Sequence, residues 1–177
     1  MTSESKSILF FSDDRRFGLN ILNPPLRKIL CLCQKANKHE TGGILLGAYS
    51  VDLSCATVTQ VFGAPDDSEA GNSWFHRGVK GMRSLLEKLW KTNHEYYLGE
   101  WHYHPFSEPE PSHTDLNELR RIAKTSSYSC PEPLMLIIGG DPNGKWCARA
   151  FVFPNGQKLE LRRSASIDGS HLFDSRA

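Results

Sequence analysis

The sequence predicts a mixed α/β domain in which helices flank a mixed β-sheet. Short β-branched or apolar runs bounded by Gly, Pro, Asn or Asp indicate strands. Other stretches carry apolar residues three and four positions apart and indicate helices. The two kinds of element intermix without a strict β-α-β-α alternation. A length of 177 residues with 39% hydrophobic residues suits one domain with a hydrophobic core.

The first half of the chain predicts a strand hairpin, a helix and two further strands. The charged turn at 13–16 separates the two strands of the hairpin. Asn23 supplies a helix cap, and the two prolines after it suit a first helical turn. A polar run with Gly and Pro at 63–73 predicts an exposed loop. The predicted elements are strands at 8–12, 17–22, 44–49 and 56–62 and a helix from 24 to about 36.

The second half predicts two amphipathic helices and four strands. Apolar residues such as Val79 and Met82, or Leu116 and Leu119, repeat at helical spacing. The strands are separated by turns that contain Gly and Pro. The predicted elements are helices at 76–91 and 112–124 and strands at 96–104, 134–138, 146–153 and 157–161. We expect the domain to span residues 1–163 and the polar segment 164–177 to be a disordered tail.

Charge and cysteine usage exclude several classes of function. With 21 Lys+Arg against 20 Asp+Glu, the chain offers no electrostatic basis for binding nucleic acid or an anionic membrane. It has no apolar run of about 20 residues and no secretory signal, so we expect a cytoplasmic protein. The five cysteines are scattered without Cys-x-x-Cys spacing, which argues against a disulfide framework or a sulfur-ligated zinc site. We expect all five to be small buried or half-buried residues.

One segment carries metal-ligand spacing. It reads Glu100-Trp-His102-Tyr-His104-Pro, and Ser-His-Thr-Asp115 follows after a proline-rich turn. Side chains two positions apart on a strand point the same way, so His102 and His104 offer two imidazoles to one metal ion. Asp115 can supply a third ligand. Two histidines and a carboxylate, with a water in the fourth position, form a catalytic zinc arrangement.

A purely structural interpretation competes for part of this segment. Ser112 and Asp115 have the spacing of a capping box, in which a serine caps a helix and an acid three residues later bonds back to it. The two interpretations are compatible, because Asp115 can face the histidines from the start of the helix.

These residues resemble the JAMM motif of the JAB/MPN metalloprotease family. The resemblance includes Glu40 far upstream, in His-Glu-Thr-Gly-Gly-Ile-Leu-Leu-Gly. It implies a zinc-dependent isopeptidase or peptidase that removes ubiquitin-like modifiers, on a curved mixed sheet with flanking helices. His102, His104 and Asp115 resemble the ligands of one zinc ion per chain. Glu40 resembles the general base, and Ser112 resembles the residue that hydrogen-bonds the oxyanion.

Neighbouring residues are expected to have structural roles. Glu100 lies on the same strand face as the two histidines and either orients an imidazole or, as we favour, lies at a solvated strand end. Trp101 and Tyr103 point to the other face and are expected to pack under a helix. The remaining histidines are expected to be surface or capping residues: His39, His76, His94, His113 and His171.

The segment Tyr-Tyr-Leu-Gly-Glu-Trp-His-Tyr-His-Pro is similar to the corresponding segment of prokaryotic JAB proteins. The similarity is greatest to the stand-alone deconjugases of type II CBASS anti-phage operons. This similarity implies a protein substrate: the C-terminal tail of a ubiquitin-like modifier or of a CBASS nucleotidyltransferase, joined to a target. The segments 65–73 and 105–111 could flank an extended tail added to a sheet edge. Gly42-Gly43 would allow a close backbone approach or simply form a turn.

Two alternative functions are possible within the same family. The enzyme could process a sulfur-carrier or ubiquitin-like protein in cofactor biosynthesis, or the domain could be a non-catalytic MPN scaffold. A zinc nucleobase deaminase would need a Pro-Cys-x-x-Cys pair, which the sequence lacks.

Overall fold

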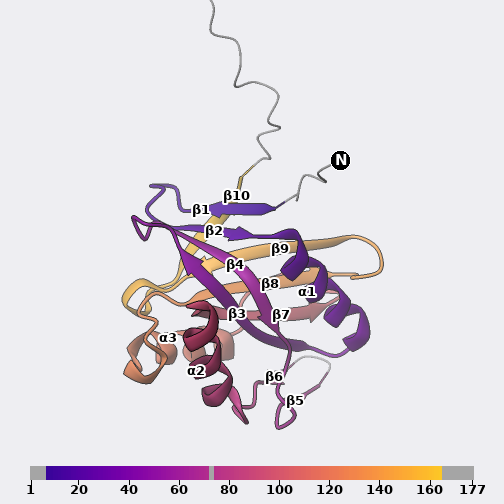
Figure 1. Cartoon of the computed structure of the whole chain (residues 1–177). Coiled ribbons are helices and arrows are strands. Elements are labelled where there is room, and N and C mark those ends of the chain that lie inside the picture. Colours follow the sequence, from indigo (N-terminus) through magenta and orange to yellow (C-terminus); the bar gives the residue numbers. More distant parts are fainter. Residues whose placement is uncertain (1–6, 72–73, 165–177) are drawn as a thin grey trace, which may run out of the picture.

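The computed structural model describes residues 7–71 and 74–164, which form ten strands and three α-helices (Figure 1). The strands are β1 (Ile8–Phe11), β2 (Gly18–Ile21), β3 (Thr41–Tyr49), β4 (Cys55–Phe62), β5 (Glu69–Ala70), β6 (Phe75–His76), β7 (Tyr96–Pro105), β8 (Leu134–Gly140), β9 (Trp146–Val152) and β10 (Leu159–Arg163). The helices are α1 (Asn23–Ala36), α2 (Met82–Asn93) and α3 (His113–Lys124), with short 3-10 turns at Ser126–Tyr128 and Pro154–Gly156. Of the predicted tail, all but Ser164 lies outside the described residues.

Eight of the strands form one closed, mixed sheet in the order β1-β10-β9-β8-β7-β3-β4-β2. The pairs β2–β4 and β7–β8 are parallel, and the hairpin β1–β2 is antiparallel, as predicted. Strands β5 and β6 form a separate two-stranded ribbon. The predicted mixed α/β class is therefore confirmed, and the curvature of the sheet is large enough to close it.

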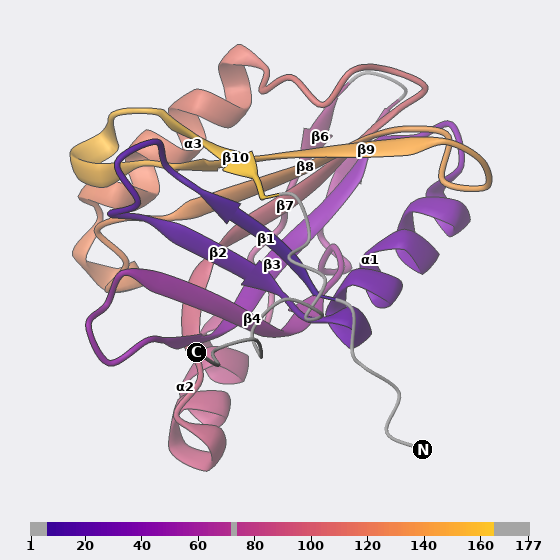
Figure 2. The same cartoon turned by 90° about the horizontal axis from the view of Figure 1, so that it is seen from above.

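Helices cover opposite faces of this sheet, each over its own core. Helix α1 packs Ile29 and Cys33 against strand residues that include Trp101 and Tyr103. Helix α3 packs Leu119 on the other face in a cluster with residues of β3, β8 and β9. Figures 1 and 2 show α1 and α3 on opposite sides of the strands. Trp101 and Tyr103 thus lie under a helix, as predicted.

Strand β3 lies inside the sheet between β4 and β7 and includes the Gly42-Gly43 pair. A Cβ on Gly43 would lie 1.9 Å from the carbonyl oxygen of Phe62 on β4. The pair therefore allows two neighbouring strands to approach each other, and the interpretation of these glycines as a turn is wrong. From Ile44 to Tyr49 β3 is paired with β4, so this stretch offers no free edge on that side.

A bulge in β7 changes which side chains share a face. Leu45 of β3 pairs with Gly99 and Leu46 with Tyr97, so Leu98 is the extra residue. Gly99 has a φ of +145°, and a Cβ there would lie 1.9 Å from the carbonyl oxygen of Leu134. As a result, Tyr97 packs in the core cluster that contains Leu119 of α3, whereas Leu98 packs in the cluster that contains Trp101 on the opposite face.

The predicted start of the second helix at residue 76 is wrong. His76 is part of β6, and α2 begins at Met82 after Gly81. The carboxylate of Asp67 accepts the backbone N–H groups of Val79 and Lys80 at 3.0 and 3.1 Å, which holds this segment in a turn. Apolar periodicity alone could not detect that competing contact.

Smaller differences occur at other element ends. Asn23 is the first residue of α1 and not its cap, and its side chain accepts a hydrogen bond from Arg27. Part of the predicted loop at 63–73 forms strand β5. The final strand begins at Leu159, because a 3-10 turn occupies Pro154–Gly156.

Candidate active site

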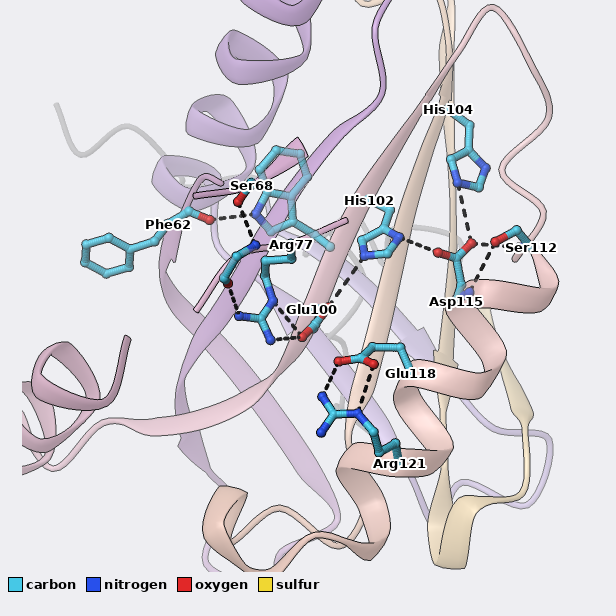
Figure 3. A network of polar contacts seen from close by, with 12 residues as sticks. Phe62, Ser68, Arg77, Glu100, His102, His104, Ser112, Asp115, Glu118 and Arg121 are labelled. Carbon is cyan, nitrogen blue, oxygen red and sulfur yellow. Dashed lines mark hydrogen bonds and ion pairs between the residues drawn. The ribbon is translucent and has the colours of Figure 1, made fainter. Parts of the chain in front are cut away.

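The site forms where the end of β7 faces the start of α3 (Figure 3). His102 and His104 project from one face of β7 toward Asp115 of α3. The opposite face of the strand is anchored by Trp101, whose indole N–H donates to the carbonyl of Phe62 at 3.0 Å. This anchoring holds the strand in the register that directs the two imidazoles toward α3.

A capping box at the start of α3 orients Asp115. The backbone N–H of Asp115 donates to the Ser112 hydroxyl oxygen at 3.1 Å, and the backbone N–H of Ser112 donates to Asp115 Oδ2 at 2.7 Å. Asp115 Oδ1 then lies 2.6 Å from His102 Nδ1, and Oδ2 lies 3.6 Å from His104 Nε2. The capping and metal-site interpretations of Asp115 are therefore compatible. Its Oδ2 accepts the backbone N–H of Ser112, while its Oδ1 faces the His102 ring.

The three side chains fit a metal ion. One ligand atom each from His102, His104 and Asp115 lies within 4.8 Å of the other two. The side chains of all three are nearly buried, with 7%, 11% and 7% exposed. Two imidazole nitrogens and a carboxylate oxygen gathered in a buried position are a donor set that divalent metals prefer. These residues could therefore hold a metal ion.

The cluster shifts the pKa values of its members in opposite directions. Burial alone would lower the pKa of His102, but the neighbouring carboxylates of Asp115 and Glu100 raise it to about 9. Burial would raise the pKa of Asp115, but the contact with His102 and the bonds to Ser112 lower it to about 2. Burial lowers the pKa of His104. The site thus favours an ionised Asp115 beside the two imidazoles.

Glu40 lies beside this cluster from a distant part of the sequence. It precedes β3, whose Thr41 is paired with Tyr103 of β7, and its backbone N–H donates to the carbonyl of Gly71 at 2.9 Å. Burial raises the pKa of the half-buried Glu40 carboxyl, and the negative charge of Asp115 raises it further. The pairing of Thr41 with Tyr103 and of Gly42 with His102 places Glu40, immediately before β3, beside the strand that carries the two histidines.

Glu100 was expected at a solvated strand end, and this expectation is wrong. Only 1% of its side chain is exposed. Arg77 Nη2 lies 2.6 Å from its Oε1, and His102 Nε2 lies 3.5 Å from its Oε2. The even spacing of Glu100, His102 and His104 on a strand was the one sequence signal for this contact.

Sequence reasoning missed two other residues near the imidazoles. Arg77 lies between β6 and α2, in a segment with no recognisable motif. Phe75 of β6 packs edge-on against the His102 ring, with centroids 5.5 Å apart and an interplanar angle of 84°. Arg77 falls in the predicted helix and Phe75 between that helix and the predicted loop at 63–73, so the β5–β6 ribbon and its flank form a wall of the site.

The remaining histidines and the cysteines mostly match their predicted roles. His39, His76, His94 and His113 are exposed, and His171 lies outside the described residues. All five cysteines are free. Cys31 and Cys147 are exposed, which differs from the expectation that every cysteine is at least half-buried. Among residues 7–71 and 74–164, none of the helices has the length and apolar character needed to cross a membrane.

Comparisons with known proteins identify the same family of metalloproteases that the site residues resemble. The family described as prokaryotic homologs of the JAB domain matches residues 23–152. A CD-NTase/cGAS isopeptidase from Enterobacter hormaechei subsp. hoffmannii (strain UCI 50) is 44% identical over 151 residues, which cover 85% of this chain and 83% of the relative. Probable metalloprotease y4qB from Sinorhizobium fredii (strain NBRC 101917 / NGR234) is 28% identical over 116 residues, which cover 64% of this chain and 70% of the relative.

A solved structure supports the fold independently. The solution structure of protein DSY2949 from Desulfitobacterium hafniense superposes with a TM-score of 0.58 at 20% identity and covers 79% of this chain and 87% of that one. Both sequence relatives are named as enzymes that cleave peptide or isopeptide bonds, which confirms the predicted class of enzyme. The chain belongs to the family of prokaryotic homologs of the JAB domain.

Proposed function

We propose that the chain is a zinc-dependent isopeptidase that releases the C-terminal tail of a ubiquitin-like modifier, or of a CBASS nucleotidyltransferase, from a conjugated target protein. One observation carries this proposal: three buried ligand groups converge beside a half-buried glutamate with a raised pKa. This is the arrangement that a metal-assisted hydrolysis of an amide bond requires.

The donor set favours zinc as the metal. His102, His104 and Asp115 offer two nitrogens and one oxygen, the three-ligand set typical of catalytic zinc. When bound, zinc would lower the pKa of a water toward about 7 and polarise the scissile carbonyl. We propose one zinc ion per chain, and the rest of the chemistry is assigned to the side chains around it.

Glu40 is the proposed general base. Burial and the nearby Asp115 charge raise the pKa of its carboxyl, which makes it a better proton acceptor than an exposed glutamate. It takes a proton from the attacking water and delivers it to the leaving amine. A lysine side-chain amine released in this way is the product of isopeptide hydrolysis.

Ser112 is the proposed oxyanion donor. Its hydroxyl oxygen accepts the N–H of Asp115, which orients the group and leaves its own hydrogen available as a donor. The residue is exposed at the rim of the site, where a substrate carbonyl can reach it. Donation to the oxygen of the tetrahedral intermediate would stabilise the developing negative charge.

The proposed substrate is an extended protein tail. The relative that is 44% identical is named a CD-NTase/cGAS isopeptidase, which supports a nucleotidyltransferase tail and a role in CBASS antiviral defence. The main sheet is closed, and we propose that an added strand pairs with the β5–β6 ribbon. Phe75 of that ribbon contacts His102, and Gly71, which follows β5, accepts the backbone N–H of Glu40, so a tail paired with the ribbon would lead into the site. We propose no nucleic-acid or membrane partner, and the predicted cytoplasmic location stays a prediction.

A reporter fusion tests this function. The C-terminal tail of a CBASS nucleotidyltransferase would be fused to a fluorescent protein, and mass spectrometry would locate the cut. We expect cleavage at the junction that is abolished by a chelator and by Glu40→Gln. Glu87→Gln, an exposed change on α2, should cleave at the wild-type rate. Cleavage of ubiquitin chains or free dipeptides alone would contradict tail recognition, and cleavage of a sulfur-carrier fusion alone would favour cofactor biosynthesis.

A further inference from the structure

We infer that Glu100 is a positioning residue for the metal site: it accepts a hydrogen bond from Nε2–H of His102 and thereby directs Nδ1 of that imidazole toward Asp115 and His104. The inference rests on the proposed function, because it concerns which nitrogen of His102 becomes the metal ligand. It adds Glu100, together with Arg77 and Tyr97, to the residues on which the site depends.

One oxygen of the Glu100 carboxylate is fully occupied by other donors. Oε1 accepts Arg77 Nε at 2.9 Å and the Tyr97 hydroxyl at 3.1 Å, and Arg77 Nη2 approaches the same oxygen at 2.6 Å. Arg77 itself is 6% exposed, and its Nη1 donates to the carbonyl of Gly78 at 3.0 Å. A guanidinium held at several points fixes the orientation of the carboxylate that it binds.

The other oxygen, Oε2, faces the His102 ring in the described part of the chain. Oε2 of Glu100 lies 3.5 Å from Nε2 of His102, and among residues 7–71 and 74–164 this buried nitrogen has no partner within normal hydrogen-bond geometry. A buried polar atom without a partner is costly. A tilt of the ring by a few tenths of an ångström brings the pair into hydrogen-bond range. The carboxylate is therefore placed to satisfy this nitrogen and leaves the other one for the metal.

The geometry assigns the ligand role to the opposite side of the ring. Nδ1 of His102 lies 2.6 Å from Oδ1 of Asp115, whose second oxygen faces His104 Nε2 at 3.6 Å. The three ligand groups thus gather on the Nδ1 side. Metal-bound histidines commonly donate the other ring N–H to a carboxylate, which fixes both the tautomer and the ring orientation. Figure 3 shows this chain of contacts from Arg77 through Glu100 and His102 to Asp115.

The bulge in β7 makes the arrangement possible. In a regular strand Tyr97 and Glu100 would point to opposite faces, because they are three positions apart. The extra residue at Leu98 brings both to the same face, and the Tyr97 hydroxyl can then donate to Oε1. The bulge that interrupts the β3–β7 pairing therefore also allows Tyr97 to hydrogen-bond Glu100, the carboxylate that faces His102.

The wild-type protein gives a direct test by NMR. Zinc-loaded protein with ¹⁵N-labelled histidine would show, through two-bond ¹H–¹⁵N correlations, which nitrogen of His102 carries hydrogen. We expect hydrogen on Nε2 and none on Nδ1. Hydrogen on Nδ1 with Nε2 bound to zinc would overturn the inference, and this measurement does not depend on any variant folding. A merely structural role of Glu100 would not determine this result.

Glu100→Gln provides the complementary test. Arg77 and Tyr97 both donate to one oxygen, so the glutamine carbonyl must face them and its NH₂ must face His102. Nε2 would then have to accept, and the ring hydrogen would move to the nitrogen that should bind zinc. We expect zinc affinity, measured by competition with a chromophoric chelator, to fall by about 10- to 100-fold. The Co²⁺ absorption spectrum of the site should change with it.

Glu95→Gln is the matched control. Its carboxylate also accepts hydrogen bonds, from Thr59, Gln60 and Asn93 at 2.6, 2.7 and 3.4 Å, but it lies just before the opposite end of β7. This variant should bind zinc as the wild type does. If Glu100→Gln bound zinc as tightly as Glu95→Gln, the positioning role would be wrong while the metal site stood. If the wild type bound no zinc, the proposed function itself would fail, and the inference with it.

Discussion

Nδ1 of His102 and Oδ1 of Asp115 lie 2.6 Å apart, although the first belongs to β7 and the second to the start of α3. One oxygen of the Asp115 carboxylate makes this contact, while the other accepts the backbone N–H of Ser112. A carboxylate has enough lone pairs for both roles. The helix cap therefore determines where a candidate ligand lies, and a change that weakens the cap should also disturb the site.

Metal content tests the three candidate ligands. We expect elemental analysis of protein purified without added metal to find about one zinc per chain, and the double variant His102→Ala/His104→Ala to lose it, because three ligands are typical of catalytic zinc. His113→Ala serves as the control, because this exposed histidine contacts only Asn117 among the hydrogen bonds of the described residues. A wild type without metal, or a double variant with unchanged content, would contradict the ligand assignment.

Glu40→Gln should separate hydrolysis from metal binding. Glu40 neighbours the cluster but is not among its three converging ligand groups. The variant should therefore keep its zinc while its rate falls by about 10² to 10⁴, the usual contribution of a general base. Zinc content and the rate of reporter cleavage would be measured on the same sample. Loss of zinc would make Glu40 a ligand and require a different base.

Ser112 has two roles that a pair of variants can distinguish. Ser112→Ala and Ser112→Gly both remove the hydroxyl, so each should lower the cleavage rate of folded enzyme on the order of 10²- to 10³-fold. Alanine at a helix cap costs about 1 kcal/mol in the free energy of unfolding, whereas glycine costs only a few tenths. Urea unfolding should therefore rank the two variants differently although their rates are alike. Full activity in folded Ser112→Gly would exclude the oxyanion role.

Gly43→Ala should destabilise the fold. Its Cβ would lie 1.9 Å from the Phe62 carbonyl oxygen, a backbone atom that cannot move without separating β3 from β4. We expect the free energy of unfolding to fall by about 3 kcal/mol or more, at or above the upper end of usual overpacking costs. Gly63→Ala is the control, because its nearest neighbour is a Leu32 methyl group at 3.4 Å. Equal stability of the two variants in urea unfolding would contradict the close approach of these strands.

The sequence by itself predicted the fold class, most of the elements and four residues of the motif, His102, His104, Ser112 and Asp115. These were predictable because their signals are local. Alternation on β7 places His102 and His104 on one face, and the spacing from Ser112 to Asp115 defines a helix cap. Glu40 could be named only through the family resemblance, because no local pattern connects it to residues so far along the chain.

Only the tertiary structure decided how these residues are supported. The burial of Glu100 and its pairing with Arg77 depend on a segment between β6 and α2 whose sequence has no recognisable motif. The contact of Tyr97 with Glu100 depends on a bulge, which reverses the alternation on which strand predictions rest. The closure of the sheet and the interior position of Gly42-Gly43 depend on pairings between distant strands. Such contacts are set by the packing of the whole chain, and local sequence patterns do not encode them.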